Sequence, residues 1–389
     1  MASTADVNPK ITKRNVFSLR ALQENLTGYA FVAPAVIIIL VFGLFPIVYS
    51  LYMSLFNWRI RKGDFTGLVN YTKIFGDWGG FAIFIGGLGL LGLAYWLWTR
   101  AFKSSSNLIR IMQIIAAIVL IVAGTIMSMG WGKMIAAGDE DFLNSLIITI
   151  FYAVGTVPLQ LGIGMVFAYL LYQKIHGKEV FRMIYFLPYV TPVVTTAVVF
   201  RTIFSSRETS LANILLSWFN AGPLKWLFEP KAMSEVFLGL KLDGIAAGPS
   251  LALGTIILFG IWSFFGYNTV IFLAGLGGIP KELYEAAEID GANGWNAFKN
   301  VTIPLLSPVS FYLFLVSFIG TFKAFNHLYV MATPNAQNTV VTASVQIFDV
   351  FYAQNNFGYA ASQSIVLFLI ILGLTLAQNK FLGERVFYG

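Results

Sequence analysis

Residues 251–275 read LALGTIILFGIWSFFGYNTVIFLAG, and this stretch contains no Asp, Glu, Lys or Arg. A helix needs about 20 predominantly apolar residues to cross the hydrocarbon core of a bilayer. The stretch is long enough for one crossing, and a polar loop that begins at Gly278 follows it. Residues 251–275 therefore predict a membrane-spanning helix.

The rest of the chain repeats this pattern. Of the 389 residues, 57% are hydrophobic and 11% are charged, whereas roughly a quarter of a soluble domain is charged. The composition excludes the soluble globular and disordered classes, and the absence of cysteine excludes a disulfide-stapled scaffold. The apolar runs that could be spans are 29–56, 81–99, 111–132, 142–172, 183–200, 251–275, 306–331 and 360–379. The sequence predicts an all-α polytopic membrane protein with about eight transmembrane helices.

Charges outside these runs predict the membrane topology of the chain. Lys10, Lys13 and Arg14 precede the first run, and cytoplasmic segments next to spans carry an excess of Lys and Arg. The N-terminus is therefore expected in the cytoplasm, and eight crossings return the C-terminus to the same side. The basic residues within 59–62 then fall outside, which is against the rule.

The longest outer loop in this topology covers residues 201–250. Its apolar residues between Leu211 and Phe219 recur at helical spacing, and Ser210 is available as an N-cap. Two settings remain open for this short helix. It could lie on the outer membrane interface as an amphipathic helix, or it could be buried within the loop.

The loop between the sixth and seventh runs, residues 278–308, begins with GIPKELYEAAEIDGA. Pro280 suits the first turn of a helix, where its missing N–H costs nothing. Asp290 and Gly291 are a turn signal, because glycine adopts a positive φ without strain. A second short helix follows, so the loop predicts a helix–turn–helix along the inner membrane face. Its alternation of acidic, small and large apolar residues favours a protein-docking element over a solvated loop.

The run EAAEIDGA at 285–292, followed by Phe298, Val301 and Pro304, resembles the EAA loop of ABC-importer permeases. These are the membrane subunits of binding-protein-dependent transport systems. In that family the loop is a coupling helix that sits in a cleft of the ATPase subunit. The resemblance implies that the ATPase contact consists of Glu285, Ala286, Ala287, Asp290 and Gly291.

Further segments resemble the carbohydrate (maltose-type) branch of that family: FVAP at 31–34, GLVNY at 67–71 and LPY at 187–189. Members of this branch usually have six spans, so the resemblance implies a six-helix core plus an inserted hairpin. The implied division is a cytoplasmic tail at 1–28, a first span and external loop at 29–78, an inserted two-span hairpin at 79–138, a permease core at 139–380 with its cytoplasmic coupling loop at 278–308, and a cytoplasmic tail at 381–389.

Prolines at 188 and 192 interrupt the fifth run, and each removes a backbone N–H and frees a carbonyl one turn back. A kink is therefore predicted beside the threonines at 191, 195 and 196. By resemblance, maltose-type permeases bind sugar from the equivalent spans. The implied substrate-pathway residues are Tyr189, Gly260, Ser263, Phe264, Tyr267, Phe322 and Phe325. Helix packing is the alternative role for each single aromatic residue among them.

Two other features of the apolar runs have simpler interpretations. Lys323, near the outer end of the seventh span, is either a snorkelling anchor or a pore residue, and the anchor is favoured. The Gly-rich segment 86–92 is interpreted as a close helix-packing face.

The chain lacks the motifs of an ATPase or a metalloenzyme. No G-x-x-x-x-G-K-[ST] run occurs, and the two histidines have no metal-ligand spacing around them. We therefore expect no catalytic residue, no metal site and no cofactor in this chain, with ATP and Mg bound by partner subunits. No basic run is dense enough for nucleic acid.

The resulting hypothesis is a non-enzymatic permease subunit of an ATP-driven importer, which moves a mono-, di- or oligosaccharide from a binding protein into the cytoplasm by alternating access. The implied partners are a second homologous permease subunit, two ATP-binding subunits, an extracytoplasmic sugar-binding protein and the lipid of a prokaryotic inner membrane. A glycerol-phosphate or polyol permease is an alternative that extra basic pore residues would favour. An ion-coupled secondary transporter would need buried acids, and a polytopic enzyme would need catalytic carboxylates.

Overall fold

The computed structural model describes residues 19–101, 106–173, 176–383 and 386. The basic cluster Lys10, Lys13 and Arg14 and parts of the two predicted tails therefore lie outside the described residues. Within the described part, helices dominate, and the one sheet is a two-stranded hairpin. The all-α prediction is confirmed.

Six helices are long and apolar enough to cross a membrane, and two bent helix pairs raise the number to eight if each pair is one span. The spanning segments are α1 (Leu19–Ile38) with η1 (Ile39–Leu44) and α2 (Phe45–Ser54), α4 (Trp78–Ala101), α5 (Ser106–Ala137), α6 (Glu140–Tyr172), the pair α7 (Lys178–Val190) and α8 (Val193–Ile203), α11 (Leu251–Gly277), the pair formed by α13 (Gly294–Ala297), η4 (Phe298–Thr302) and α14 (Ile303–Leu305) with α15 (Ser307–Phe322), and α19 (Phe357–Gly383). Each of them overlaps one of the eight apolar runs of the sequence, although the seventh span ends at Phe322, within the run 306–331.

Short elements connect the spans. They are β1 (Phe56–Trp58), β2 (Lys62–Phe65), α3 (Val69–Phe75), α9 (Leu211–Ser217), η2 (Trp226–Phe228), α10 (Met233–Leu238), η3 (Gly244–Ala247), α12 (Lys281–Ile289), α16 (Asn326–Met331), η5 (Pro334–Ala336), α17 (Gln337–Val340) and α18 (Ala343–Tyr352). β1 and β2 pair antiparallel, with Phe56 opposite Phe65 and Trp58 opposite Lys62.

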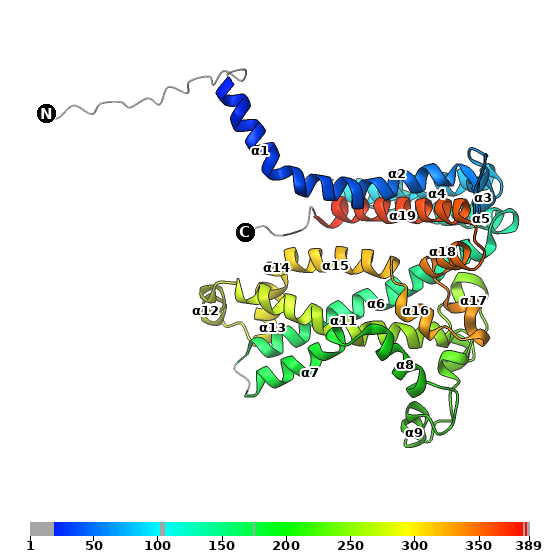
Figure 1. Cartoon of the computed structure of the whole chain (residues 1–389). Coiled ribbons are helices and arrows are strands. Elements are labelled where there is room, and N and C mark those ends of the chain that lie inside the picture. The colour runs from blue at the N-terminus through cyan, green and yellow to red at the C-terminus, as the bar shows by residue number, and fades with distance from the viewer. Residues whose placement is uncertain (1–18, 102–105, 174–175, 384–385, 387–389) are drawn as a thin grey trace.

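Figure 1 shows the spans as a bundle with a common long axis. Helix α2 lies along α19 on one side of the bundle, and α11 lies along α6 on the other side, with α15 in contact with both α6 and α19. α12 lies at one end of the bundle and α17 at the opposite end. Loop 278–308 and the segment 204–250 are therefore at different ends of the molecule.

The buried apolar side chains gather in three clusters. One joins α6, α8, α11 and α16 around Tyr152 and Phe259, and a second joins α5, α6, α15 and α19 around Phe142 and Phe322. The third joins α6, α11 and α15 around Phe272. The first and third clusters lie on opposite halves of α11, so the middle of this helix lies between two apolar regions.

α4 and α5 form a hairpin whose two helices approach closely at glycines. A Cβ on Gly87 would lie 2.4 Å from Cγ of Met127, and one on Gly130 would lie 2.5 Å from the backbone nitrogen of Phe84. The other glycines of the segment 86–92 have no atom within 4 Å of such a Cβ. The packing role expected for the Gly-rich segment is therefore found at Gly87 alone.

The turn between α5 and α6 is tied to α19 by one carboxylate. Oδ1 of Asp139 accepts a hydrogen bond from the backbone N–H of Phe142 at 2.9 Å and so caps α6. Oδ2 accepts from the Tyr359 hydroxyl at 2.5 Å and from Nε2 of Gln363 at 3.0 Å. Asp139 thus joins two spans that are far apart in the sequence.

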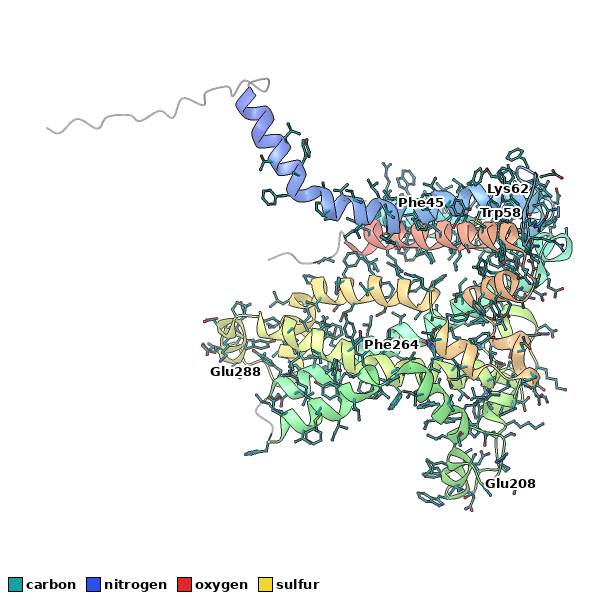
Figure 2. The ribbon with its side chains drawn as sticks, viewed as in Figure 1. Phe45, Trp58, Lys62, Glu208, Phe264 and Glu288 are labelled. Carbon is teal, nitrogen blue, oxygen red and sulfur yellow. The ribbon has the colours of Figure 1, made fainter. Side chains whose placement is uncertain are left out.

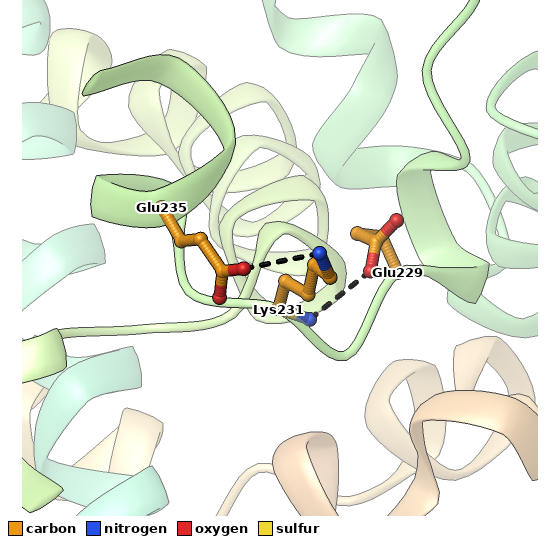
Figure 3. A network of polar contacts seen from close by, with 3 residues as sticks. All are labelled: Glu229, Lys231 and Glu235. Atoms are coloured by element: carbon orange, nitrogen blue, oxygen red, sulfur yellow. Dashed lines mark hydrogen bonds and ion pairs between the residues drawn. The ribbon is translucent and has the colours of Figure 1, made fainter. Parts of the chain in front are cut away.

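The segment between α8 and α11 contains the predicted short helix, α9. One side of α9 is buried at Ala212 and Asn213, whereas Leu211, Ile214 and Leu215 are exposed, as are Trp218 and Phe219 just after the helix. Farther along, Lys231 forms an ion pair with Glu235 at 3.0 Å, and its backbone N–H donates to Oε1 of Glu229 (Figure 3). The hydrogen bond to Glu235 raises the pKa of Lys231.

Candidate transport site and docking loop

A cavity of about 450 Å³ lies where two helical segments are interrupted. The axis bends by 96° between α7 and α8 at Thr191 and Pro192, and α15 ends at Phe322 before α16 begins at Asn326. Both interruptions contribute lining residues, and the middle of α11 forms another wall. Figure 2 shows Phe264 of this wall at mid-length of the bundle, far from Glu288 at one end and Glu208 in the segment after α8.

The bend between α7 and α8 follows from local chemistry. Pro188 and Pro192 lack backbone N–H groups, so the helical ladder cannot continue through them. Both the backbone N–H and the hydroxyl of Thr191 donate to the carbonyl of Leu187, at 3.1 and 2.8 Å. The hydroxyl of Thr196 donates to the carbonyl of Pro192 at 3.0 Å. These threonines satisfy backbone carbonyls at the bend, which is how broken helices are tolerated within a membrane. The predicted kink is present.

Aromatic rings form one face of the cavity. Tyr189 of α7 stacks on Tyr267 of α11, with ring centroids 4.7 Å apart and planes at 25°. Phe264 meets the edge of Tyr189 at 6.2 Å, and Phe325 lines the wall from the break after α15. This arrangement offers flat apolar surface beside the polar groups of the other walls, a combination typical of ligand sites.

Polar side chains form the remaining walls. They are contributed by α6, α11, α15 and the start of α16: Gln160, Ser263, Asn268, Ser317, Thr321 and Asn326. The hydroxyl of Tyr152 and Nε2 of His327 share a hydrogen bond of 2.7 Å at the same wall. Among the described residues that line the cavity, Lys323 alone carries a permanent charge. The cavity is therefore mostly neutral, with one cation at its edge.

Loop 278–308 folds as the predicted helix–turn–helix, α12 followed by α13. Gly291 has a φ of +79°, its N–H bonds the carbonyl of Glu288, and the N–H of Ala292 bonds the carbonyl of Ala287 at 2.9 Å. This is a Schellman ending, and its left-handed position favours glycine. Asn293 then caps α13 by accepting from the N–H of Asn296 at 2.9 Å.

Two tyrosines hold the loop against the bundle. The Tyr284 hydroxyl shares a hydrogen bond of 3.0 Å with Thr302, and the Tyr169 hydroxyl of α6 donates to the carbonyl of Gly294 at 3.2 Å. Burial raises the pKa of Tyr284, so its hydroxyl stays protonated at neutral pH. The opposite side of the loop is open, with Ile289 and Trp295 exposed by 86% and 68%.

Residues 160–385 match the family model described as the inner membrane component of binding-protein-dependent transport systems. The chain belongs to this family. The match covers the cavity helices α7, α8, α11 and α15 and all of loop 278–308. The protein is therefore a multi-pass membrane protein of an inner-membrane transport family, as the sequence predicted.

Curated relatives extend over more of the chain. An arabinooligosaccharide transport permease, AraP of Bacillus subtilis (strain 168), is 30% identical over 75% of this chain and 89% of its own length. The lactose transport permease LacF of Rhizobium radiobacter is 27% identical over 93% and 95%. The glycerol-3-phosphate permease UgpA of Agrobacterium fabrum is 30% identical over 64% and 79%.

A solved structure shares the fold. It is a bacterial ABC transporter involved in import of the acidic polysaccharide alginate, and one of its chains superimposes with a TM-score of 0.65 over 94% of this chain and 98% of its own length. The sequence identity is 16%, so this likeness concerns the fold.

Five of the seven substrate-pathway residues expected in this permease line the cavity: Tyr189, Ser263, Phe264, Tyr267 and Phe325. Gly260 and Phe322 do not line it. A Cβ on Gly260 would lie 2.7 Å from the Tyr152 hydroxyl, so this glycine lies behind the wall and makes room for that tyrosine. Phe322 is buried and stacks on Phe318.

Lys323 follows the end of α15 directly and lines the cavity, which favours the pore position over the snorkelling anchor. Gln160 and Asn268, which are not among the seven implied pathway residues, also line the wall, from α6 and α11. The available signal was an amide within each of two predominantly apolar runs. Of the five predicted docking residues, Glu285, Ala286, Asp290 and Gly291 are exposed, and Ala287 is half-buried.

Proposed function

We propose that this chain is the permease subunit of an ATP-driven importer, which moves a saccharide from a binding protein into the cytoplasm by alternating access. One observation carries the proposal: the stacked Tyr189 and Tyr267 face a polar, mostly neutral cavity at the point where two helical segments are interrupted. A sugar ring has an apolar face and a polar rim, so it needs both kinds of surface. The names of AraP and LacF, which transport arabinooligosaccharides and lactose, support this solute class.

Loop 278–308 is proposed as the coupling element. Glu285, Ala286, Asp290 and Gly291 are exposed on it, and Ala287 lies beside them, so a partner surface could contact this group. Exposed Ile289 and Trp295 add apolar area that such a contact would bury. The partner would be one of two ATP-binding subunits, which would bind ATP and Mg and supply the free energy.

The proposed assembly contains a second homologous permease subunit and an extracytoplasmic binding protein. The solved alginate transporter was crystallised with a periplasmic protein bound to alginate pentasaccharide, which supports a binding protein as partner. The loop would face the cytoplasm together with both chain termini, and the segment with α9 would face outside. Residues 79–138 are proposed as a hairpin peripheral to a permease core at 139–380.

A second candidate is a permease for an anionic polyol or saccharide. Lys323 at the cavity favours it, because a cation placed there would attract a phosphate or carboxylate. UgpA, named as a glycerol-3-phosphate permease, is a relative of this kind.

The test is to purify the complex with its partner subunits in vesicles and to measure ATP-dependent uptake. The panel would contain lactose, arabinooligosaccharides, alginate oligosaccharides and glycerol-3-phosphate. Uptake of a neutral saccharide that requires ATP supports the first proposal, and uptake of anions alone supports the second. Uptake that persists without ATP and the partner subunits contradicts both. Labelling from outside at a cysteine placed at Glu288 would contradict the cytoplasmic position of the loop.

A further inference from the structure

A polar stripe runs along the face of α6 that meets α11. Tyr152, Thr156 and Gln160 follow one another at intervals of four residues, which places them on one side of the helix. The next position in the series is Gly164, and a Cβ there would lie 3.0 Å from Cβ of Asn268 on α11. Gln160 and Asn268 therefore face each other across the two helices within about one helical turn.

Both amides are buried, and each has at least one polar atom without a partner. Gln160 is 2% exposed and Asn268 is 1% exposed. Oε1 of Gln160 and both Oδ1 and Nδ2 of Asn268 have no hydrogen-bond partner among the described residues. An unpaired buried polar group destabilises a fold, whereas an apolar side chain of the same size would avoid that loss. Both residues contribute to the lining of the cavity. Their unpaired atoms are themselves buried, so a side-chain rotation is needed before they contact a molecule there.

We propose that Gln160 and Asn268 form a hydroxyl-binding subsite of the cavity that accepts neighbouring hydroxyls of a neutral saccharide. An amide side chain has one acceptor oxygen and a donor NH₂ group, and a hydroxyl both donates and accepts. Two amides therefore match two hydroxyls. This inference rests on the proposed function, and it deepens it by naming the groups of the solute that are recognised.

The chemistry separates this subsite from an anion site. A carboxylate or phosphate only accepts hydrogen bonds when ionised, so it would leave the amide oxygens of Gln160 and Asn268 unpaired. Lys323 lies on α15's side of the cavity, at the break that precedes α16, rather than on α6 or α11. The amide pair therefore favours the neutral hydroxyls of a sugar. Lys323 is a hydrogen-bond donor only, so it does not distinguish one hydroxyl of a sugar from another.

The experiment compares Gln160→Met and Asn268→Leu with the control Thr156→Val in the complete complex. Thr156 lies one turn from Gln160 on the same face, its hydroxyl is also buried without a partner, and it does not line the cavity. Uptake of lactose and arabinotriose is measured, followed by singly deoxygenated derivatives of the transported sugar. Assembly and thermal stability are recorded for every variant.

We expect the two cavity variants to assemble at least as stably as wild type, because they remove unpaired polar groups. Their KM for the parent sugar should rise about tenfold, the effect of a lost hydrogen bond to a polar ligand. For the deoxy sugar that lacks the recognised hydroxyl, wild type and variant should have equal KM values. Thr156→Val should match wild type with every sugar.

Three results would overturn the subsite: failure of the cavity variants to assemble, an equal loss with every deoxy sugar, or the same loss in Thr156→Val. Unchanged KM values of the two cavity variants for the parent sugar would show that the amides bind water alone. This result would also overturn the subsite. A wild-type complex that transports neither sugar contradicts the proposed function and the subsite together. A transporting wild type with unaffected variants contradicts the subsite only.

Discussion

Replacing Gly266 with alanine should disrupt the cavity from a position that does not touch the solute. Gly266 lies on α11 where α7 crosses it, and a Cβ there would be 2.0 Å from the backbone oxygen of Tyr185 and 2.9 Å from its carbonyl carbon. Ordinary contacts of a Cβ begin at 3.4 Å. The clashing atoms belong to the backbone, so no side-chain rotation can relieve the overlap, and α7 must move by roughly 1 Å in this close-packed interior.

This shift has two consequences. Overpacking of a helix contact costs about 1–3 kcal/mol, so the thermal stability of the complex should fall. Tyr189 is one turn after Tyr185 on α7, and Tyr267 directly follows Gly266, so the same displacement separates the rings that stack at 4.7 Å. Loss of an aromatic pair is worth about 0.5–1.5 kcal/mol, which raises the KM for a stacked solute up to about tenfold.

The matched control is Gly162→Ala on α6, where a Cβ would have no atom within 4 Å. Alanine within a helix is about 0.5–1 kcal/mol more favourable than glycine, so this variant should be as stable as wild type or more stable. Thermal unfolding of the purified complex and uptake kinetics are the two assays. If Gly266→Ala had the stability and the KM of Gly162→Ala, the close contact between α7 and α11 would not exist in the protein.

Four further predictions concern other parts of the molecule. Asp139→Ala removes an N-cap and two hydrogen bonds to α19, so the complex should lose about 2–3 kcal/mol in thermal unfolding, whereas Glu140→Ala should change little. Gly291→Val forces a branched side chain into a left-handed backbone position, so we expect uncoupled ATPase activity and no uptake with normal membrane insertion; normal uptake would contradict a docking role. Tyr189→Ala should raise the KM for sugar by about tenfold and leave assembly unchanged, and the reverse order would remove Tyr189 from the site. Lys323→Met should leave uptake of neutral sugars unchanged and reduce uptake of any anionic solute, and a loss confined to neutral sugars would refute the charge argument.

The spans and the helix–turn–helix of loop 278–308 were predictable because their physical causes are local. A helix in a membrane needs a long, predominantly apolar run, and each of the eight runs overlaps a span or a bent pair. The bend at Thr191 was predictable from Pro188 and Pro192, since a proline removes a donor wherever it occurs. The turn at Gly291 was predictable because only glycine adopts its backbone conformation without strain.

The break after α15 was not predicted, although Lys323, Asn326 and His327 interrupt the apolar run there. The run at 306–331 reads as one helix by hydropathy, yet the helix ends at Phe322 and a new one begins at Asn326. Lys323 consequently lines the cavity. Its place depends on the tertiary packing of Phe322 into the cluster around Phe142, which no periodicity of the sequence records.

Gly260 shows a different limit of sequence reasoning. Its position in the sixth run suggested a surface for the solute, but in the structure it accommodates the hydroxyl of Tyr152. That hydroxyl in turn shares a hydrogen bond with His327 at the cavity wall. The glycine therefore affects the cavity through Tyr152 and His327. These residues are far from Gly260 in the sequence, so their contacts could not be read from it.

The arrangement of the cavity has a physical rationale. A transport site must bind its solute and then release it, so its polar groups have to be available within an apolar bundle. Unpaired amides such as Gln160 and Asn268 destabilise the bundle, and this loss is offset by the two apolar clusters that pack on either half of α11. The interruptions between α7 and α8 and between α15 and α16 lie between these clusters. The part of the bundle that the unpaired amides destabilise is therefore confined to the cavity. Under the proposed alternating access, a rearrangement at the cavity around Thr191 and Lys323 would leave both halves of α11 packed.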